Sequence, residues 1–198
     1  KRGILGGASN RLFSAYESSD ERVEVYFDLN KDTLWCEIVV GGTGRSLETS
    51  QVFRDPAAWY HLVWAVDTTQ GTDTNRTKIY INGSQVTAFD TSTYPVEDAD
   101  TAVNYTVDQV IGKTLAGGDN YWDGYLAEVY MIDGTALAAS DFGELDSDTD
   151  QWIPIDSDDV SVTFGTNGCY QKYGSDQSMN SFTDSSSSAH AITAGGGT

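Results

Sequence analysis

The stretch FRDPAAWYHLVWAVDTTQGTDTNRTKIYINGSQV (residues 53–86) decides the fold class of this chain. Its apolar run over residues 60–66 is typical of a strand that is covered on both faces. After a polar loop, residues 78–82 alternate between polar and apolar side chains, and Asn82-Gly83 is the dipeptide that best tolerates positive φ in a hairpin turn. These two strands predict an antiparallel sheet, with Trp59 and Trp64 contributing to its core.

Further strand signals occur at the spacing expected of a β-sandwich. Residues 23–29 and 34–40 each alternate and are joined by the turn residues 30–32, which predicts a hairpin with one buried face. Shorter strands are expected over residues 47–52, 107–112, 126–132 and 160–164. One short helix is expected over residues 135–142. The sequence therefore predicts an all-β, antiparallel sandwich.

Length and composition indicate one main domain. A chain of 198 residues is long enough to bury one sandwich core, which we assign to residues 1–170. Residues 171–198 are rich in Ser and Gly and poor in apolar side chains, which predicts a linker and the start of a following module. Cys36 and Cys169 lie in apolar, strand-like settings and are expected to be core thiols, with a disulfide between them left open.

The charge of the chain excludes one class of partner. Thirty acidic and 11 basic residues give a net charge of −19, and such a surface repels phosphate. We therefore expect no nucleic-acid partner. A stretch of about 18 apolar residues, as a membrane-spanning helix requires, does not occur in the sequence, so membrane insertion is not expected either.

Several motifs, taken in order, resemble a known family. They are KIYING (78–83), WDGYLAEVYMIDG (122–134), ALAASDFGE (136–144), WIP (152–154) and GTNGCY (165–170). The ordered set resembles the laminin-G/pentraxin branch of the concanavalin A-like lectin/glucanase superfamily, and especially the sandwich modules of tailed-bacteriophage virion proteins. This resemblance spans roughly residues 1–170 and implies a jelly-roll sandwich. It places Lys1-Arg2-Gly3 at the end of an early strand, so we expect that strand to be missing from the N-terminus.

The sequence lacks the catalytic pattern of the glucanases in that superfamily. Those enzymes carry Glu-x-Asp-x-x-Glu on one strand, and neither EVYFD (24–28) nor EVYMID (128–133) has this spacing. Glu24 and Asp28 share a strand face, which we interpret as the solvated side of a hairpin. The only histidines, His61 and His190, are too few for a histidine-based metal site. We therefore predict that the protein is not an enzyme.

One loop combines oxygen ligands with aromatic rings. Sandwich lectins bind sugars in this way, because a ring stacks on the apolar face of a hexose while carboxylates and amides take its hydroxyls. The predicted glycan-binding residues are Asp119, Asn120, Tyr121, Trp122 and Asp123. The resemblance implies that calcium, the only cofactor indicated, would be held here by Asp119 and Asp123. The alternative is that Trp122 simply packs the end of a hairpin.

Together these observations predict a non-enzymatic virion module in a tail fibre, an appendage or a capsid-surface decoration. Its expected roles are particle assembly and adhesion to the host surface. Its expected partners are other virion subunits, further copies of the chain and a host glycan or receptor. Two alternatives remain open, namely a dedicated calcium-dependent lectin domain and a glycan-cleaving enzyme with the same sandwich.

Overall fold

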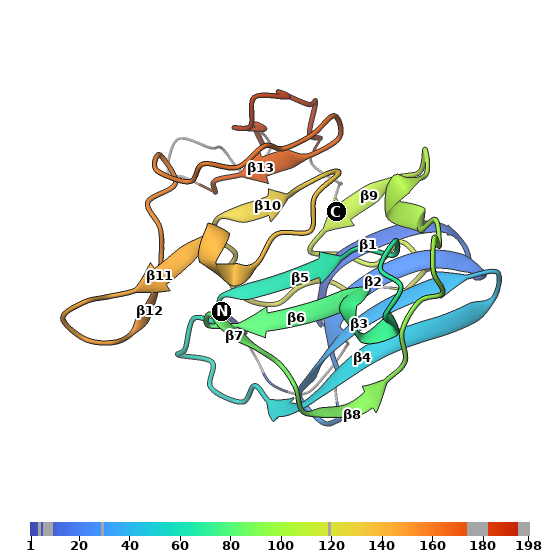
Figure 1. Cartoon of the computed structure of the whole chain (residues 1–198), viewed down its shortest axis with the longest axis horizontal. Coiled ribbons are helices and arrows are strands. Elements are labelled where there is room, and N and C mark those ends of the chain that lie inside the picture. Colours follow the sequence, from blue (N-terminus) through green and yellow to red (C-terminus); the bar gives the residue numbers. More distant parts are fainter. Residues whose placement is uncertain (4, 6–9, 29, 119, 174–181, 194–198) are drawn as a thin grey trace. The chain divides into compact units, whose positions relative to one another are not determined.

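The computed structural model describes residues 1–3, 5, 10–28, 30–118, 120–173 and 182–193 (Figure 1). Its regular structure is almost entirely antiparallel strand, consistent with a β-sandwich, so the predicted fold class is confirmed. The chain divides into two compact units, which are described separately. Unit 1 comprises Lys1–Tyr60, Val66–Ile79 and Gln85–Gly124, and unit 2 comprises His61–Ala65, Tyr80–Ser84 and Tyr125–Thr198.

Unit 1 is built on a six-stranded antiparallel sheet, whose long strands lie side by side in Figure 1. In spatial order the strands are β8 (Phe89–Ser92), β4 (Thr43–Val52), β3 (Thr33–Val40), β2 (Glu21–Phe27), β1 (Asn10–Ser18) and β9 (Gln109–Ile111). The predicted hairpin is β2 and β3, and Asp28 shapes its turn by accepting the backbone N–H groups of Asn30 and Lys31, both at 2.9 Å. Strands β1 and β8 were not predicted.

The core of unit 1 lies on the sheet face that carries Val23 and Phe27 of β2. Its buried apolar side chains include Val23, Phe27, Leu34, Cys36, Ile38, Leu47, Phe53 and Ile79. The ring of Phe53 packs edge-on against those of Phe27 and Tyr60, each with centroids 5.1 Å apart. Arg2 is also buried here, with its guanidinium 4.7 Å above Phe27 and 3.1 Å from Asp32. Burial raises the pKa of the Cys36 thiol.

The structure shows how deeply the tryptophans and cysteines that were expected in the core are buried. Trp59 was expected in the core but is 54% exposed, because it follows a tight turn in which Asp55 accepts the N–H of Ala57 (2.8 Å) and the chain runs on without strand partners. Trp64 is half-buried. Both cysteines are free thiols, with Cys36 buried and Cys169 half-buried.

The strands predicted from residues 53–86 are present. They are β5 (Leu62–Val66) and β6 (Thr77–Ile81), which form a three-stranded sheet with β7 (Ser84–Gln85). Positive φ at Asn82 (47°) and Gly83 (81°) confirms the predicted turn. Asn82 also fixes the entry to β5, because its N–H donates to the His61 carbonyl (2.9 Å) and its Oδ1 accepts the His61 N–H (2.8 Å).

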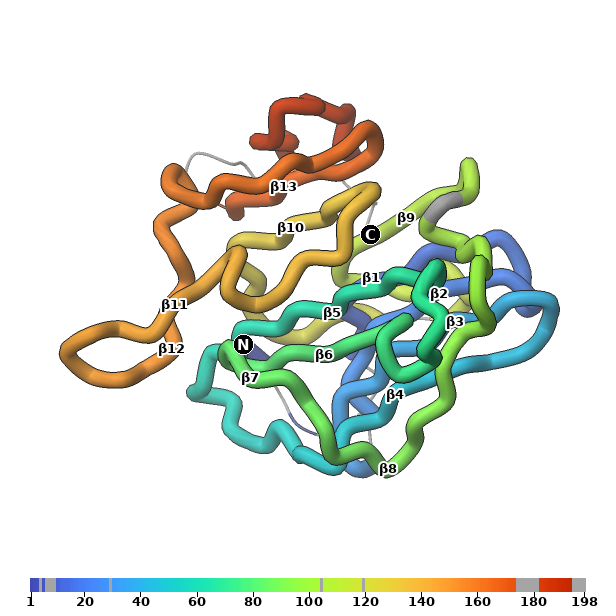
Figure 2. Tube along the Cα trace, in the orientation of Figure 1, coloured from blue at the N-terminus to red at the C-terminus, as the bar shows by residue number. Residues whose placement is uncertain are grey.

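Unit 2 contains two short two-stranded sheets, β10 (Val129–Met131) with β13 (Cys169–Gln171), and β11 (Gly143–Leu145) with β12 (Trp152–Pro154). The β11–β12 hairpin ends in the extended loop visible in Figure 2. The helix predicted over 135–142 is reduced to a 3-10 turn at Ala139–Asp141, because Phe142 leads directly into β11. Residues 160–164 form no strand. The other 3-10 turns among the described residues are Asp73–Asn75 and Ala102–Asn104.

Trp152 covers the Asn82-Gly83 turn within unit 2. A Cβ at Gly83 would overlap the indole ring, so the absence of a side chain lets the ring approach the backbone. The indole Nε1 donates a hydrogen bond to Nδ1 of His61 (3.0 Å). Burial lowers the pKa of His61, which favours the neutral imidazole that accepts this bond.

The described part of residues 171–198 is anchored to unit 2. Gln171 ends β13 and is 1% exposed. Asp184 is 6% exposed and accepts the backbone N–H groups of Tyr170, Ser186 and His190 at 2.8–2.9 Å. Burial opposes ionisation of Asp184, but these hydrogen bonds outweigh it and lower the pKa of the carboxyl. The predicted domain boundary near residue 170 stays a prediction.

Candidate functional site

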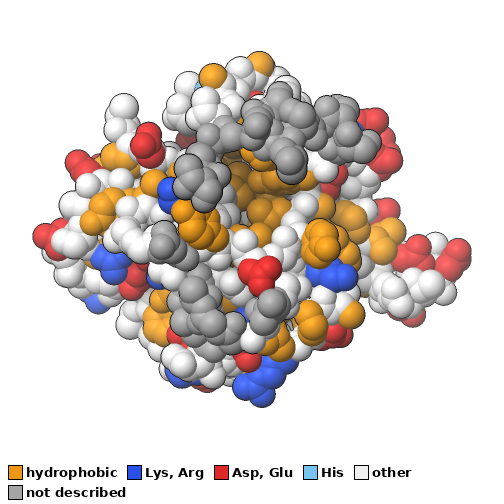
Figure 3. Space-filling model, turned by 180° about the vertical axis from the view of Figure 1, so that it is seen from behind, with side chains coloured by type: hydrophobic (Ala, Val, Ile, Leu, Met, Phe, Trp, Pro, Cys, Tyr) orange, Lys and Arg blue, Asp and Glu red, His pale blue; other side chains and the backbone are white. Residues whose placement is uncertain are grey.

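On one face of the molecule, the charge by itself marks no site. On the face shown in Figure 3, acidic side chains are scattered rather than gathered in one patch. Within the described residues, no group of three or more His, Cys, Asp or Glu side chains is arranged to hold a metal ion. No helix in that part of the chain is long and apolar enough to cross a membrane. A candidate site must therefore be found from local geometry.

The face of the six-stranded sheet opposite the core carries polar and aromatic side chains in two rows across the strands. One row pairs Ser14 with Glu24, Glu24 with Glu37, and Glu37 with Ser46. The neighbouring row pairs Arg11 with Tyr26, Tyr26 with Trp35, and Trp35 with Glu48. We call these eight residues the aromatic–charged face. The alternation of side chains in β2 and β3 could be seen in the sequence. Only the strand register, however, brings the residues of the two rows together.

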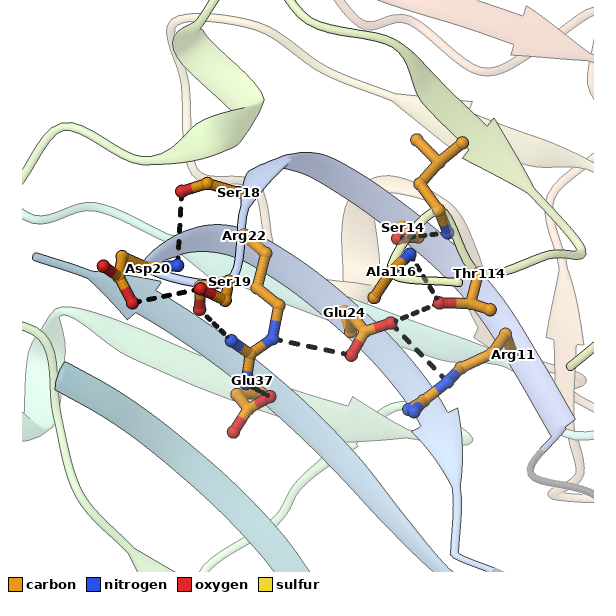
Figure 4. Close-up of polar contacts among 11 residues, drawn as sticks. Arg11, Ser14, Ser18, Ser19, Asp20, Arg22, Glu24, Glu37, Thr114 and Ala116 are labelled. Atoms are coloured by element: carbon orange, nitrogen blue, oxygen red, sulfur yellow. Dashed lines mark hydrogen bonds and ion pairs between the residues drawn. The ribbon is translucent and has the colours of Figure 1, made fainter. Parts of the chain in front are cut away.

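Glu24 lies at the centre of the first row, and its burial shows that one sequence prediction was wrong. It was expected on a solvated face but is 4% exposed, because residues 113–116 fold over it and Thr114 Oγ1 donates to Glu24 Oε1 at 2.8 Å. Figure 4 shows the carboxylate between two guanidinium groups, with Arg11 Nε 3.6 Å from Oε1 and Arg22 Nε 3.8 Å from Oε2. Burying a carboxylate is costly unless it is paired, and these partners supply that pairing.

Arg22 links Glu24 to its cross-strand neighbour. Its Nη2 lies 3.2 Å from Glu37 Oε2, and its Nη1 donates to the Ser19 carbonyl. The Glu37 side chain is 19% exposed, compared with 5% for Glu24. Of these two neighbouring carboxylates, Glu37 is therefore the more accessible to a ligand.

Glu48 forms a second buried polar node at the end of the other row. It is 1% exposed, and its Oε1 accepts hydrogen bonds from Lys31 Nζ (2.7 Å) and Thr33 Oγ1 (3.0 Å). Thr91 Oγ1 donates to Oε2 at 3.2 Å. The carboxylate oxygens are thus occupied by protein donors, so Glu48 fixes the sheet face rather than offering free acceptors.

The aromatic part of the face retains unused donors. The rings of Tyr26 and Trp35 stack with centroids 6.0 Å apart, and the Arg11 guanidinium lies 3.7 Å from the Tyr26 centroid. Burial, and then the charge of Glu37, raise the pKa of Tyr26 to about 12, so its hydroxyl keeps its proton at neutral pH. Trp35 Nε1 and Arg11 Nη1 are buried without a hydrogen-bond partner among the described residues. Such groups are expected to find an acceptor.

The predicted loop rim is only partly exposed. Tyr121 is 45% exposed, with Lys113 Nζ 5.8 Å from its ring, and Asp123 is exposed. Asn120 and Trp122 are half-buried, while Asp119 lies outside the described residues.

Trp122 packs into unit 1 rather than forming an open platform. Its ring is 6.0 Å from that of Phe27, and its Nε1 is buried. This is the packing alternative considered from the sequence, so of the two rim aromatics Tyr121 has the exposed ring. Glycan binding by the rim, and calcium binding by Asp119 and Asp123, stay predictions.

Comparison with known proteins places the chain in a family. Residues 4–141, more than half of the chain, match the family described as the Concanavalin A-like lectin/glucanases superfamily. The chain therefore belongs to the concanavalin A-like lectin/glucanase superfamily, as its antiparallel β-architecture also indicates. No curated protein and no solved structure matches it significantly.

Proposed function

We propose that this chain is a non-catalytic glycan-binding module of a tailed-bacteriophage virion, used for adhesion to the host surface. The observation that carries the proposal is the stacked Tyr26–Trp35 pair beside two buried donors, Trp35 Nε1 and Arg11 Nη1, which have no hydrogen-bond partner among the residues that the structure describes. Aromatic side chains with a few polar groups are the usual lining of carbohydrate sites. Sugar hydroxyls are acceptors that suit both donors.

Binding is favoured over cleavage by the state of the carboxylates. Glycoside hydrolysis requires two carboxyl groups that flank the scissile bond and reach it directly. Glu24 and Glu37 are adjacent across the strands, but Arg22 contacts both of them and Thr114 covers Glu24. This geometry supports a role for Glu24 in holding the face together. Release of reducing ends from any bound polysaccharide would contradict the non-catalytic assignment.

The virion assignment rests on the ordered motifs that resemble phage sandwich modules. The net charge of −19 is in keeping with a surface-exposed particle protein that does not contact nucleic acid. In this setting we expect contacts with other virion subunits and with further copies of the chain. Immunogold labelling with an antibody against the chain tests this directly, and intact particles that are never labelled would count against it.

The glycan-binding part is tested on an array of bacterial surface polysaccharides, with and without calcium. We expect Trp35→Phe to weaken binding about tenfold, because it keeps a stacking ring but removes one hydrogen-bond donor. Tyr121→Ala is the matched aromatic substitution on the loop rim and should change binding little. The opposite result, with calcium required and Tyr121→Ala inactive, would favour the dedicated calcium-dependent lectin with its site at the rim.

A further inference from the structure

A second feature of unit 1 is an open pocket of about 130 Å³ at the end of the β3–β4 hairpin. Its floor comes from two cross-strand pairs, Ile38 with Arg45 and Val40 with Thr43, whose side chains share one sheet face. Pro95, Val96 and Ala99 form its wall. The lining is therefore mostly aliphatic, with one guanidinium and one hydroxyl.

The wall of the pocket is held in place by hydrogen bonds from residues outside it. Arg76 Nη1 donates to the Pro95 carbonyl (3.0 Å), and Arg76 Nη2 pairs with Glu97 (3.1 Å). Thr68 Oγ1 donates to the Ala99 carbonyl at 3.0 Å. The wall is consequently organised before any ligand arrives, which lowers the entropic cost of binding. Because Arg76 engages Glu97, this acidic side chain of the wall is not the partner of Arg45.

Arg45 differs from every other arginine of the chain. The other five each lie within ion-pair distance of a carboxylate; they are Arg2, Arg11, Arg22, Arg54 and Arg76. Arg45 has no ion pair, hydrogen bond or ring contact within the described part of the chain. In a protein of net charge −19, a partly buried guanidinium without an anionic partner is exceptional. It points to an anion supplied from outside.

We propose that this pocket, whose floor lies on the core side of the sheet and is therefore separate from the aromatic–charged face, is a second site that binds a hexuronate; this inference goes beyond the proposed function. A guanidinium pairs a carboxylate through two parallel hydrogen bonds, which is the strongest contact that Arg45 offers. The C–H face of the sugar ring covers the aliphatic wall at Pro95 and Val96, and the Thr43 hydroxyl is available to a ring hydroxyl. A neutral hexose leaves Arg45 unpaired, and a small inorganic anion leaves the wall uncovered.

The test is a titration of the ¹⁵N-labelled full chain with glucuronate, followed by two-dimensional amide NMR at constant ionic strength. Glucose and acetate are the comparison ligands, since each carries only half of the required chemistry. We expect glucuronate to shift the amide signals of Arg45 and Val96. Arg45→Gln should weaken its binding about tenfold or more. Lys78→Gln is the matched control, because it removes an equal charge from a side chain that also lacks a carboxylate partner among the described residues.

Several outcomes would overturn this inference. Equal shifts with acetate would mean a simple anion site, and equal shifts with glucose would mean that the carboxylate is not recognised. Unchanged glucuronate binding by Arg45→Gln, or an equal loss with Lys78→Gln, would remove Arg45 as the specific contact. Failure here is distinguishable from failure of the proposed function: the array with Trp35→Phe tests the aromatic–charged face, whatever the result for glucuronate at Arg45.

Discussion

Glu24 in unit 1 and Glu128 in unit 2 are both withdrawn from water, but they are satisfied by different partners. Glu24 is 4% exposed and lies between the guanidinium groups of Arg11 and Arg22. Glu128 is half-buried, and its Oε2 accepts hydrogen bonds from the phenols of Tyr130 (3.1 Å) and Tyr170. Of these two carboxylates, the more deeply buried one is paired with opposite charge, whereas the half-buried one is satisfied by neutral donors.

The two carboxylates also lie in different kinds of secondary structure. Glu24 belongs to a sheet with long strands, where the register fixes each neighbour. Glu128 precedes a three-residue strand and has a left-handed backbone (φ 54°). Its tyrosines lie in a stack of rings, with Tyr130 4.3 Å from Tyr170 and 5.2 Å from Phe142. Burial raises the pKa of both Tyr130 and Tyr170, so the two phenols remain neutral donors.

The largest effect is expected from Glu24→Ala. It leaves Arg11 without its carboxylate and should lower the free energy of unfolding of unit 1 by about 3 kcal/mol, the cost of breaking a buried ion pair. Glu37→Ala is the matched control in the more exposed position and should cost about 1 kcal/mol or less. Urea denaturation measures both. Equal losses would mean that burial of Glu24 does not set its importance.

Gly83→Ala tests how far the stability of unit 2 depends on close packing. This substitution should lower the free energy of unfolding by about 2–3 kcal/mol. The new methyl group combines the strain of positive φ with overlap against the Trp152 ring. Gly134→Ala separates these effects, because Gly134 has similar φ (84°) but no atom lies within 4 Å of the place that its methyl group would take. It should cost about 1 kcal/mol. Thermal denaturation of the two variants gives the difference, and equal values would contradict the packing explanation.

Tyr170→Phe sharpens the comparison of the carboxylates. It removes one neutral donor from Glu128 while keeping the stacked ring, so we expect a loss of about 1 kcal/mol in stability. Phe164→Leu is a control that alters the ring stack without removing a donor. A loss after Tyr170→Phe as large as that after Glu24→Ala would mean that neutral and charged partners are equivalent here.

The smallest effect concerns acid and His61. Because burial lowers its pKa in the folded state, the unfolded chain binds a proton more readily. The stability associated with neutral His61 is therefore present above the unfolded pKa of about 6.5 and declines as pH falls from there toward the lower folded pKa. Amide exchange at β5 between pH 7 and pH 5 measures the change. His61→Gln should remove this part of the pH dependence, and an unchanged profile would contradict the assignment.

The sequence predicted the strands better than it predicted the burial of individual side chains. Alternation and the Asn82-Gly83 turn predicted β2, β3, β5 and β6, because burial of one strand face and positive φ are local properties that residue types record. The burial of Glu24 was missed since it depends on Thr114, ninety positions away. The exposure of Trp59 was missed for a related reason. The apolar character of a residue after a turn does not show whether its side chain points into the core or toward solvent.

The sequence by itself determined the antiparallel all-β class, the hairpin turns and the superfamily, because local backbone preference and ordered motifs suffice for these. Only the tertiary structure decided the aromatic–charged face, the pocket at Arg45 and the inward packing of Trp122. Each of them joins residues from separate segments, so strand register and loop placement create the neighbourhood. The spacing of residues along the chain carries no direct record of either.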